Sequence, residues 1–170
     1  MRSSSARTLW RGIRGELPDW LWDNAAEPAF CEPGFFSSST SIATAIEYLA
    51  PDRPNTLLEV VPNMEGHDWL SWQAGVVVSS LSQFACEEEV LFAPCLLFEL
   101  LEPHMEARFG RSQPTGGTAN DDRGRRAVAA RFTRVASHDV DPRLQAAIDS
   151  GQLDPRTIVF RVRPHVAPWF

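Results

Sequence analysis

The stretch Ser80-Leu-Ser-Gln-Phe-Ala-Cys-Glu-Glu-Glu-Val-Leu-Phe-Ala-Pro94 places three adjacent glutamates between a short polar turn and an apolar run. Because residues i and i+2 of a strand share a face, we expect Glu87 and Glu89 to point the same way and Glu88 to point away. Two carboxylates on one face, at the mouth of a predicted β-hairpin, create a negative potential that suits a cationic ligand or transition state. For the triplet taken alone, the alternative is an ordinary solvated acidic turn.

Carboxylates in this arrangement suit two chemical tasks. One can stabilise a sugar oxocarbenium ion, and the other can hold or deprotonate a weakly nucleophilic acceptor. A sugar-cleaving hydrolase that uses Glu87 and Glu89 as its acid pair is disfavoured. Residues so close in sequence lie on one edge, and they do not flank a scissile bond from opposite sides.

The sequence around the triplet predicts an α+β domain with a mostly antiparallel sheet and two small helices. Branched and aromatic runs indicate strands, and Asp141-Pro142 before a run that ends at Gly151 indicates a capped helix. The hydroxyls of 37–41 suit a loop followed by a helix N-terminus. Strands are expected over 8–13, 56–61, 75–79, 89–92, 96–101, 128–135 and 157–162, a further helix over 42–49, a helical turn over 17–24, a loop over 62–75, and an exposed insertion over 103–126.

Composition limits the classes of function. A chain of 170 residues suits one domain, 1–170, and a net charge of −6 gives no reason to expect nucleic acid as a partner. Three cysteines without CxxC spacing and four scattered histidines fit neither a disulfide framework nor a metal site. The sequence has no apolar run that could span a bilayer and no secretory signal, which favours a soluble intracellular protein without a membrane partner. Its oligomeric state stays open.

Two other segments could carry chemistry. Arg11 and Gly12 follow the apolar pair Leu9-Trp10. A guanidinium can hold a phosphate or a carboxylate bidentately, and a glycine lets backbone approach a ligand closely. The alternative for Arg11 alone is a surface arginine, and the alternative for the hydroxyls of 37–41 is a helix cap with a loop.

Together and in this order, the three segments resemble the R-S-E class of arginine-specific mono-ADP-ribosyltransferases, a family that includes bacterial toxins. The resemblance is carried by Trp10-Arg11-Gly12, by Gly34-Phe35-Phe36-Ser37-Ser38-Ser39, and by the aromatic turn 82–91 that contains Glu87-Glu88-Glu89. It covers about 9–102 and implies an ADP-ribosyltransferase-type split, mostly antiparallel β-sheet core with small flanking helices. Such domains usually carry a helical segment before the arginine strand, and only ten residues precede Arg11. We therefore expect that segment to be missing.

The resemblance also implies the roles of individual residues toward NAD, with NADP as the alternative co-substrate. Arg11 would contact the phosphates or ribose, and the backbone of Gly12 would hydrogen-bond the nicotinamide amide. Phe35 would add a cofactor contact. Ser37 would hold Glu89, which would bond the nicotinamide-ribose 2′-hydroxyl and stabilise positive charge as the glycosidic bond breaks.

On the acceptor side, the resemblance implies a protein that presents an exposed arginine. Glu87 would orient that guanidinium and take a proton from it, and Phe84 at the turn would pack against the incoming protein. Phe84 could equally be a partly exposed turn aromatic without that role. Two other functions stay open: an NAD glycohydrolase, in which water replaces the acceptor, and a catalytically silent domain of the same fold.

Overall fold

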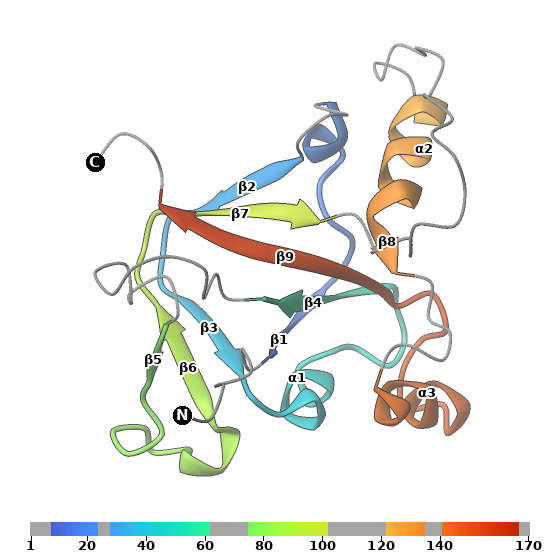
Figure 1. Ribbon diagram of the computed structural model, residues 1–170. Coiled ribbons are helices and arrows are strands. Elements are labelled where there is room, and N and C mark those ends of the chain that lie inside the picture. Colours follow the sequence, from blue (N-terminus) through green and yellow to red (C-terminus); the bar gives the residue numbers. More distant parts are fainter. Residues whose placement is uncertain (1–7, 24–27, 62–74, 102–121, 135–140, 167–170) are drawn as a thin grey trace, which may run out of the picture.

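The computed structural model describes residues 8–23, 28–61, 75–101, 122–134 and 141–166 (Figure 1). Its strands are β1 (Leu9–Arg14), β2 (Ala29–Glu32), β3 (Phe36–Ser39), β4 (Asn55–Val60), β5 (Val76–Val77), β6 (Glu89–Phe92), β7 (Leu96–Leu101), β8 (Thr133–Arg134) and β9 (Ile158–Val166). Its helices are α1 (Ile42–Glu47), α2 (Asp122–Phe132) and α3 (Pro142–Asp149), with 3₁₀ turns η1 (Asp19–Asp23) and η3 (Ala85–Glu87).

The strands form one sheet in the order β2-β7-β9-β4-β1-β3-β6-β5, and β8 pairs with β9. Among the described strands, β4 and β9 pair in parallel, and the other pairs are antiparallel. The predicted α+β class with a mostly antiparallel sheet and small flanking helices is therefore confirmed.

The sheet is split between β1 and β3. All six residues of β1 pair with β4, whereas β1 and β3 share the single register pair Trp10–Ser39. In Figure 1, β3, β6 and β5 run across the direction of β7 and β9. A sheet that parts in this way opens a space between two groups of strands while their backbones stay joined at one point.

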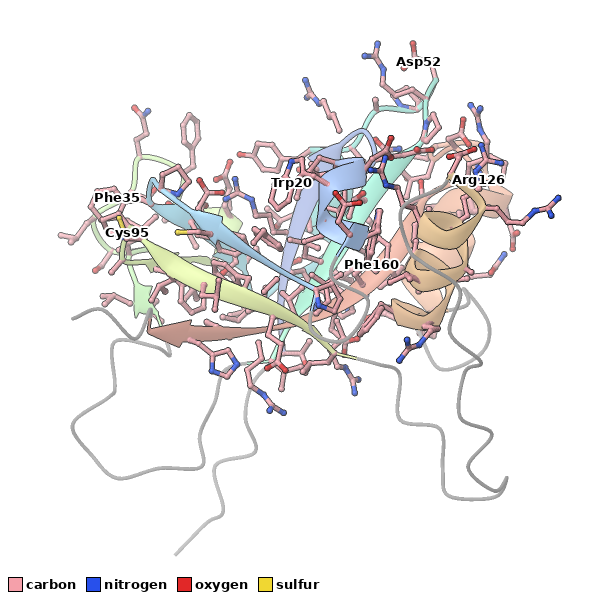
Figure 2. The ribbon with its side chains drawn as sticks, turned by 90° about the horizontal axis from the view of Figure 1, so that it is seen from above. Trp20, Phe35, Asp52, Cys95, Arg126 and Phe160 are labelled. Atoms are coloured by element: carbon pink, nitrogen blue, oxygen red, sulfur yellow. The ribbon has the colours of Figure 1, made fainter. Side chains whose placement is uncertain are left out.

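Helices cover both faces of the sheet. Strand β4 is buried along its whole length, as expected for a central strand with a parallel neighbour. Its Leu57 packs in a cluster with α1 and α3, and its Leu58 packs in a second cluster that includes residues of η1 and α2. Phe160 of β9 belongs to the second cluster and lies inside the molecule beside α2 (Figure 2).

The predicted helix signals are confirmed in α1 and α3. Ser41 caps α1, and its Oγ accepts a hydrogen bond from the Thr44 N–H at 3.4 Å. Asp141 caps α3 by accepting from the Arg143 N–H at 2.9 Å, with Pro142 in the first turn. Gly151 follows α3 with φ +74°, a conformation that favours glycine.

The elements expected over 37–41 and over 128–135 are wrong. The segment 37–41 was expected to begin as a loop, but Ser37 to Ser39 lie in β3 and pair with β6. The strand expected over 128–135 is mostly the end of α2, followed by the two residues of β8. Val128 and Phe132 are both buried one helical turn apart, so a helical period governs this segment.

Other expectations lie partly or wholly outside the described residues. In the loop expected over 62–75, only Gly75 is described. In the insertion expected over 103–126, residues 103–121 lie outside the described part. The last five residues of that insertion, 122–126, begin α2 and are a correction. Strand β2 was not expected from the sequence. No helix among the described residues is long and apolar enough to cross a membrane.

Candidate active site

A cavity of about 280 Å³ opens where β1 and β3 part. Glu87 and Glu89 of the triplet, the arginine strand and the serine segment are far apart in the sequence, and all of them reach it. Helix α1 forms the remaining wall. The lining residues are Trp10, Arg11 and Gly12 of β1, Ser37, Ser38 and Ser39 of β3, Thr44, Ala45 and Tyr48 at α1, and Glu87 and Glu89.

Arg11 bridges the split from β1 to β3. Its Nη1 donates to the backbone oxygen of Ser37 at 2.9 Å, and its guanidinium carbon lies 4.4 Å from the centroid of the Phe36 ring. Burial lowers the pKa of Arg11, and the charge of Glu32 opposes that shift. An arginine stays protonated at neutral pH, so it gives the cavity a fixed positive group. A guanidinium has five N–H donors, and the bond to Ser37 uses one of them.

Glu89 is held from the opposite strand. It opens β6 across from Ser39, and its Oε1 accepts a hydrogen bond from Ser37 Oγ at 2.6 Å. A short hydroxyl-to-carboxylate bond of this kind is charge-assisted, and it fixes where the acceptor oxygen points. The carboxylate is partly buried and lines the cavity. Ser37 therefore orients Glu89 toward the cavity.

Glu87 and Glu89 reach the same cavity, but the strand argument for that arrangement is wrong. Glu87 ends the 3₁₀ turn η3, and Glu88 adopts a left-handed conformation with φ 49° and ψ 45° before β6 begins at Glu89. A turn of the backbone, not strand alternation, brings the two carboxylates together. Glu88 is exposed, and its carboxylate accepts a hydrogen bond from Thr40 outside the cavity lining.

The serine segment also holds the backbone of this turn. Ser39 Oγ donates to the Glu87 carbonyl oxygen at 2.6 Å, and Ser38 Oγ donates to the Val90 carbonyl oxygen at 3.0 Å. The Thr40 N–H donates to the Glu88 carbonyl oxygen at 3.3 Å. Hydroxyl side chains satisfy carbonyls at the strand end, where the ladder gives way to the turn. The position of the glutamates therefore depends on β3.

Gly12 lies where α1 crosses β1. A Cβ built on it would lie 2.3 Å from the Ala45 carbonyl oxygen and 2.8 Å from Leu49 Cδ2. Its missing side chain lets the helix pack directly on the strand. Close approach of backbone was expected at this glycine, and the structure shows that the approaching group is a helix of the same chain.

The two phenylalanines expected at the site lie outside the cavity lining. Phe35 precedes β3 and is 65% exposed, at the end of the molecule opposite Arg126 of α2 (Figure 2). Phe84 caps η3 and is 54% exposed. The structure therefore brings together Arg11, Gly12, Ser37, Glu87 and Glu89, and it leaves Phe35 and Phe84 at the surface.

The sequence did not single out the α1 residues of the cavity. Thr44 and Tyr48 are four positions apart and Ala45 and Tyr48 are three apart, and these spacings put each pair on one helical face. The Tyr48 hydroxyl donates to Glu87 Oε1 at 2.8 Å. Those spacings, counted along the helix expected over 42–49, were the signal that could have identified the three residues.

Comparisons with known proteins leave the function to be argued from these residues. No family model and no curated protein matches the chain. Solved structures similar to it include the ADP-ribosyltransferase HopU1 of Pseudomonas syringae pv. Tomato DC3000, at 15% identity and a TM-score of 0.46, covering 93% of this chain and 44% of that one. The Vis toxin, an ADP-ribosyltransferase from Vibrio splendidus, is 18% identical, with 97% and 51% covered and a TM-score of 0.46.

The Salmonella SpvB ATR domain is 12% identical, with 97% of this chain and 64% of that one covered and a TM-score of 0.44. The chain thus spans between 44% and 64% of the length of these three structures. The cavity offers a half-buried cation, Arg11, and two carboxylates, Glu87 and Glu89.

Proposed function

We propose that this chain transfers ADP-ribose from NAD to an arginine side chain of a protein acceptor and releases nicotinamide. NADP is the alternative donor. The observation that carries the proposal is the pair of carboxylates on one turn, Glu87 and Glu89, facing the cavity that also holds Arg11. Ser37 orients Glu89. The 3₁₀ turn η3 and the left-handed backbone of Glu88 bring Glu87 to the same cavity.

Glu89 is suited to the bond-breaking step. As the bond between ribose C1′ and the nicotinamide ring nitrogen breaks, the electron pair goes to the nicotinamide, which leaves neutral, and positive charge develops on the ribose. A carboxylate that is already fixed by Ser37 at 2.6 Å stabilises that charge without reorganising. It would also accept a hydrogen bond from the ribose 2′-hydroxyl.

Glu87 is suited to the acceptor. A guanidinium has a pKa above about 12 and is a poor nucleophile unless a base orients it and takes a proton. In the transfer, a guanidinium nitrogen forms the new bond to C1′, and the proton it loses passes to Glu87. Water attacking C1′ in its place would give free ADP-ribose, the product of a glycohydrolase.

Arg11 and Gly12 supply the donor side of the cavity. The N–H groups of Arg11 that do not bond Ser37 can hold a phosphate or ribose oxygen. The backbone of Gly12, which lines the cavity, can hydrogen-bond the nicotinamide amide. A cavity of about 280 Å³ is at the small end of ligand sites, which suits the nicotinamide-ribose end of a dinucleotide.

The test incubates the chain with NAD labelled in the adenylate part and with agmatine as a small guanidine acceptor. We expect a labelled agmatine adduct and free nicotinamide from the unaltered protein. Glu89→Gln should lower turnover about a hundredfold or more, the effect of removing one preorganised charge-stabilising group. Glu87→Ala should abolish the adduct while NAD hydrolysis persists.

Glu88→Gln is the matched control. Its carboxylate is one position from each of the others but faces Thr40 outside the cavity, so both activities should stay within about twofold of the unaltered protein. Free ADP-ribose without adduct at any agmatine concentration would identify a glycohydrolase. No NAD binding by calorimetry would identify a silent domain. If Glu87→Ala leaves both activities unchanged, the role given to Glu87 is wrong.

A further inference from the structure

Tyr48 lies in the cavity wall that α1 forms. It is the C-cap residue of α1, it lines the cavity, and its side chain is half exposed. Its hydroxyl donates to Glu87 Oε1 at 2.8 Å, a contact between residues 39 positions apart. Tyr48 thus touches the carboxylate that the proposed function assigns to the acceptor.

The backbone of Tyr48 is fixed from the arginine strand. Arg14 Nε donates to the Tyr48 carbonyl oxygen at 2.8 Å, which ties the end of α1 to β1. Glu87 is in turn held from β3 and from α1: Ser39 binds its carbonyl oxygen at 2.6 Å, and Tyr48 binds its carboxylate. One contact sets where the residue lies, and the other sets where its carboxylate points.

We propose that Tyr48 is a positioning residue that holds the Glu87 carboxylate toward the acceptor and so directs ADP-ribose to arginine in preference to water. This inference rests on the proposed function. A guanidinium must be met by a carboxylate in a defined plane, because its N–H donors form a rigid fork. Water has no such requirement. Loss of the Tyr48 hydrogen bond to Glu87 should therefore slow transfer to arginine more than transfer to water.

The order in which bonds break and form shows which part of the transfer depends on Glu87. The bond from C1′ to nicotinamide breaks, with its electron pair going to nicotinamide, and this event precedes any need for Glu87. The bond from a guanidinium nitrogen to C1′ then forms, and one proton passes from that nitrogen to Glu87. A misdirected carboxylate slows the second event and leaves the first to be completed by water.

The chain offers an optical probe for this contact. Tyr48 is its single tyrosine, and all of its basic residues other than histidine are arginine. Phenol ionisation read by ultraviolet absorbance therefore reports Tyr48 alone, with no lysine titrating in the same range. The hydrogen bond to Glu87 raises the pKa of Tyr48 most, followed by burial and by the negative charges of Glu87, Glu89 and Glu47.

The first experiment compares two single-charge removals by this titration, with far-UV circular dichroism at each pH to show that the fold persists. Glu87→Ala removes both the acceptor and its charge, so the pKa of Tyr48 should fall. Glu47→Ala is the matched control, since it removes a nearby charge but no hydrogen bond to the phenol. It should lower the pKa by less. Equal shifts in the two variants, or no shift in Glu87→Ala, overturn the inference whatever the activity.

The second experiment measures the ratio of agmatine adduct to free ADP-ribose in Tyr48→Phe. This change keeps the ring and removes the hydroxyl. We expect the ratio to fall about tenfold, the factor for losing one hydrogen bond to a charged group, and the KM for agmatine to rise while the KM for NAD does not. Ser150→Ala removes a hydroxyl at the C-terminal end of α3, outside the cavity lining, and should leave the ratio unchanged.

The outcomes separate the two claims. If the unaltered protein forms adduct and Tyr48→Phe gives the same ratio, this inference is overturned and the proposed function stands. If the unaltered protein releases no nicotinamide from NAD, the proposed function is overturned and the steering role with it. If the KM values for NAD and agmatine rise together, Tyr48 shapes the cavity as a whole, and the assignment to Glu87 is wrong.

Discussion

Replacing Gly12 with alanine tests the packing that shapes the cavity. The added Cβ would lie 2.3 Å from the Ala45 carbonyl oxygen and 2.8 Å from Leu49 Cδ2. Leu49 can change rotamer, but Ala45 O is helix backbone and cannot. Ordinary contact begins at about 3.4 Å, so α1 must move away from β1 by roughly 1 Å. Overpacking of this kind costs about 1–3 kcal/mol.

Part of this cost is offset in the unfolded chain. Replacing a glycine with alanine reduces the entropy of the unfolded state, which stabilises by about 0.4–1 kcal/mol where the native conformation allows it. The clash with backbone outweighs that gain, so we expect a net loss of about 1–2 kcal/mol. For a chain of 170 residues this corresponds to a fall in Tm of roughly 2–8 °C.

Urea unfolding followed by circular dichroism measures the effect, and Gly34→Ala is its control. The nearest atom to a Cβ at Gly34 is 3.8 Å away, so that variant should stay within about 0.5 kcal/mol of the unaltered protein. If Gly12→Ala unfolds at the same urea concentration as Gly34→Ala, α1 does not pack on β1 as described. The same displacement would move the cavity wall formed by Thr44 and Tyr48, so weaker NAD binding should accompany the loss of stability.

Three further variants test the scaffold. Phe36→Ala empties a fully buried position in the aromatic cluster and should cost about 3–5 kcal/mol in urea unfolding. Asp154 has a pKa lowered to about 2 by its hydrogen bonds with Arg156, so it contributes stability that is complete above about pH 4 and lost as the pH falls toward 2; Asp154→Asn should flatten stability measured over that window. Glu59→Ala should cost about 3–5 kcal/mol, because it removes the carboxylate 2.9 Å from the mostly buried Arg161; a cost below about 1 kcal/mol would contradict that role.

Elements with one dominant local signal could be predicted from the sequence. Strand β6 begins and ends where expected, at Glu89 and Phe92, and the cap at Asp141-Pro142 fixes the start of α3. In both cases a change of residue type marks the boundary. The end of α2 could not be placed as readily, because the short run around Val128 fits a strand and a helix equally until its partner is known.

The serine segment shows why local propensity failed at the site. Ser37 to Ser39 carry small hydroxyl side chains that favour turns and caps, yet they form a strand because β6 offers a complete partner. Their hydroxyls then bond Glu89, the Val90 carbonyl and the Glu87 carbonyl. These contacts join residues about fifty positions apart, which no local pattern contains. Pairing with β6 therefore outweighed the local preference of these serines for a turn, in the segment that binds the Glu87–Glu89 turn.

The split in the sheet explains why one cation and two acids can share a cavity. Beyond the Trp10–Ser39 pair, β1 and β3 no longer exchange ladder bonds, so the side chain of Arg11 crosses the gap to the Ser37 carbonyl oxygen. Ser37 then turns its hydroxyl to Glu89. Ser37 therefore accepts a hydrogen bond from Arg11 with its backbone oxygen and donates one to Glu89 with its hydroxyl. Any ligand that enters between the strands meets opposite charges whose separation is fixed by Ser37, and a change in the strand pairing would alter both at once.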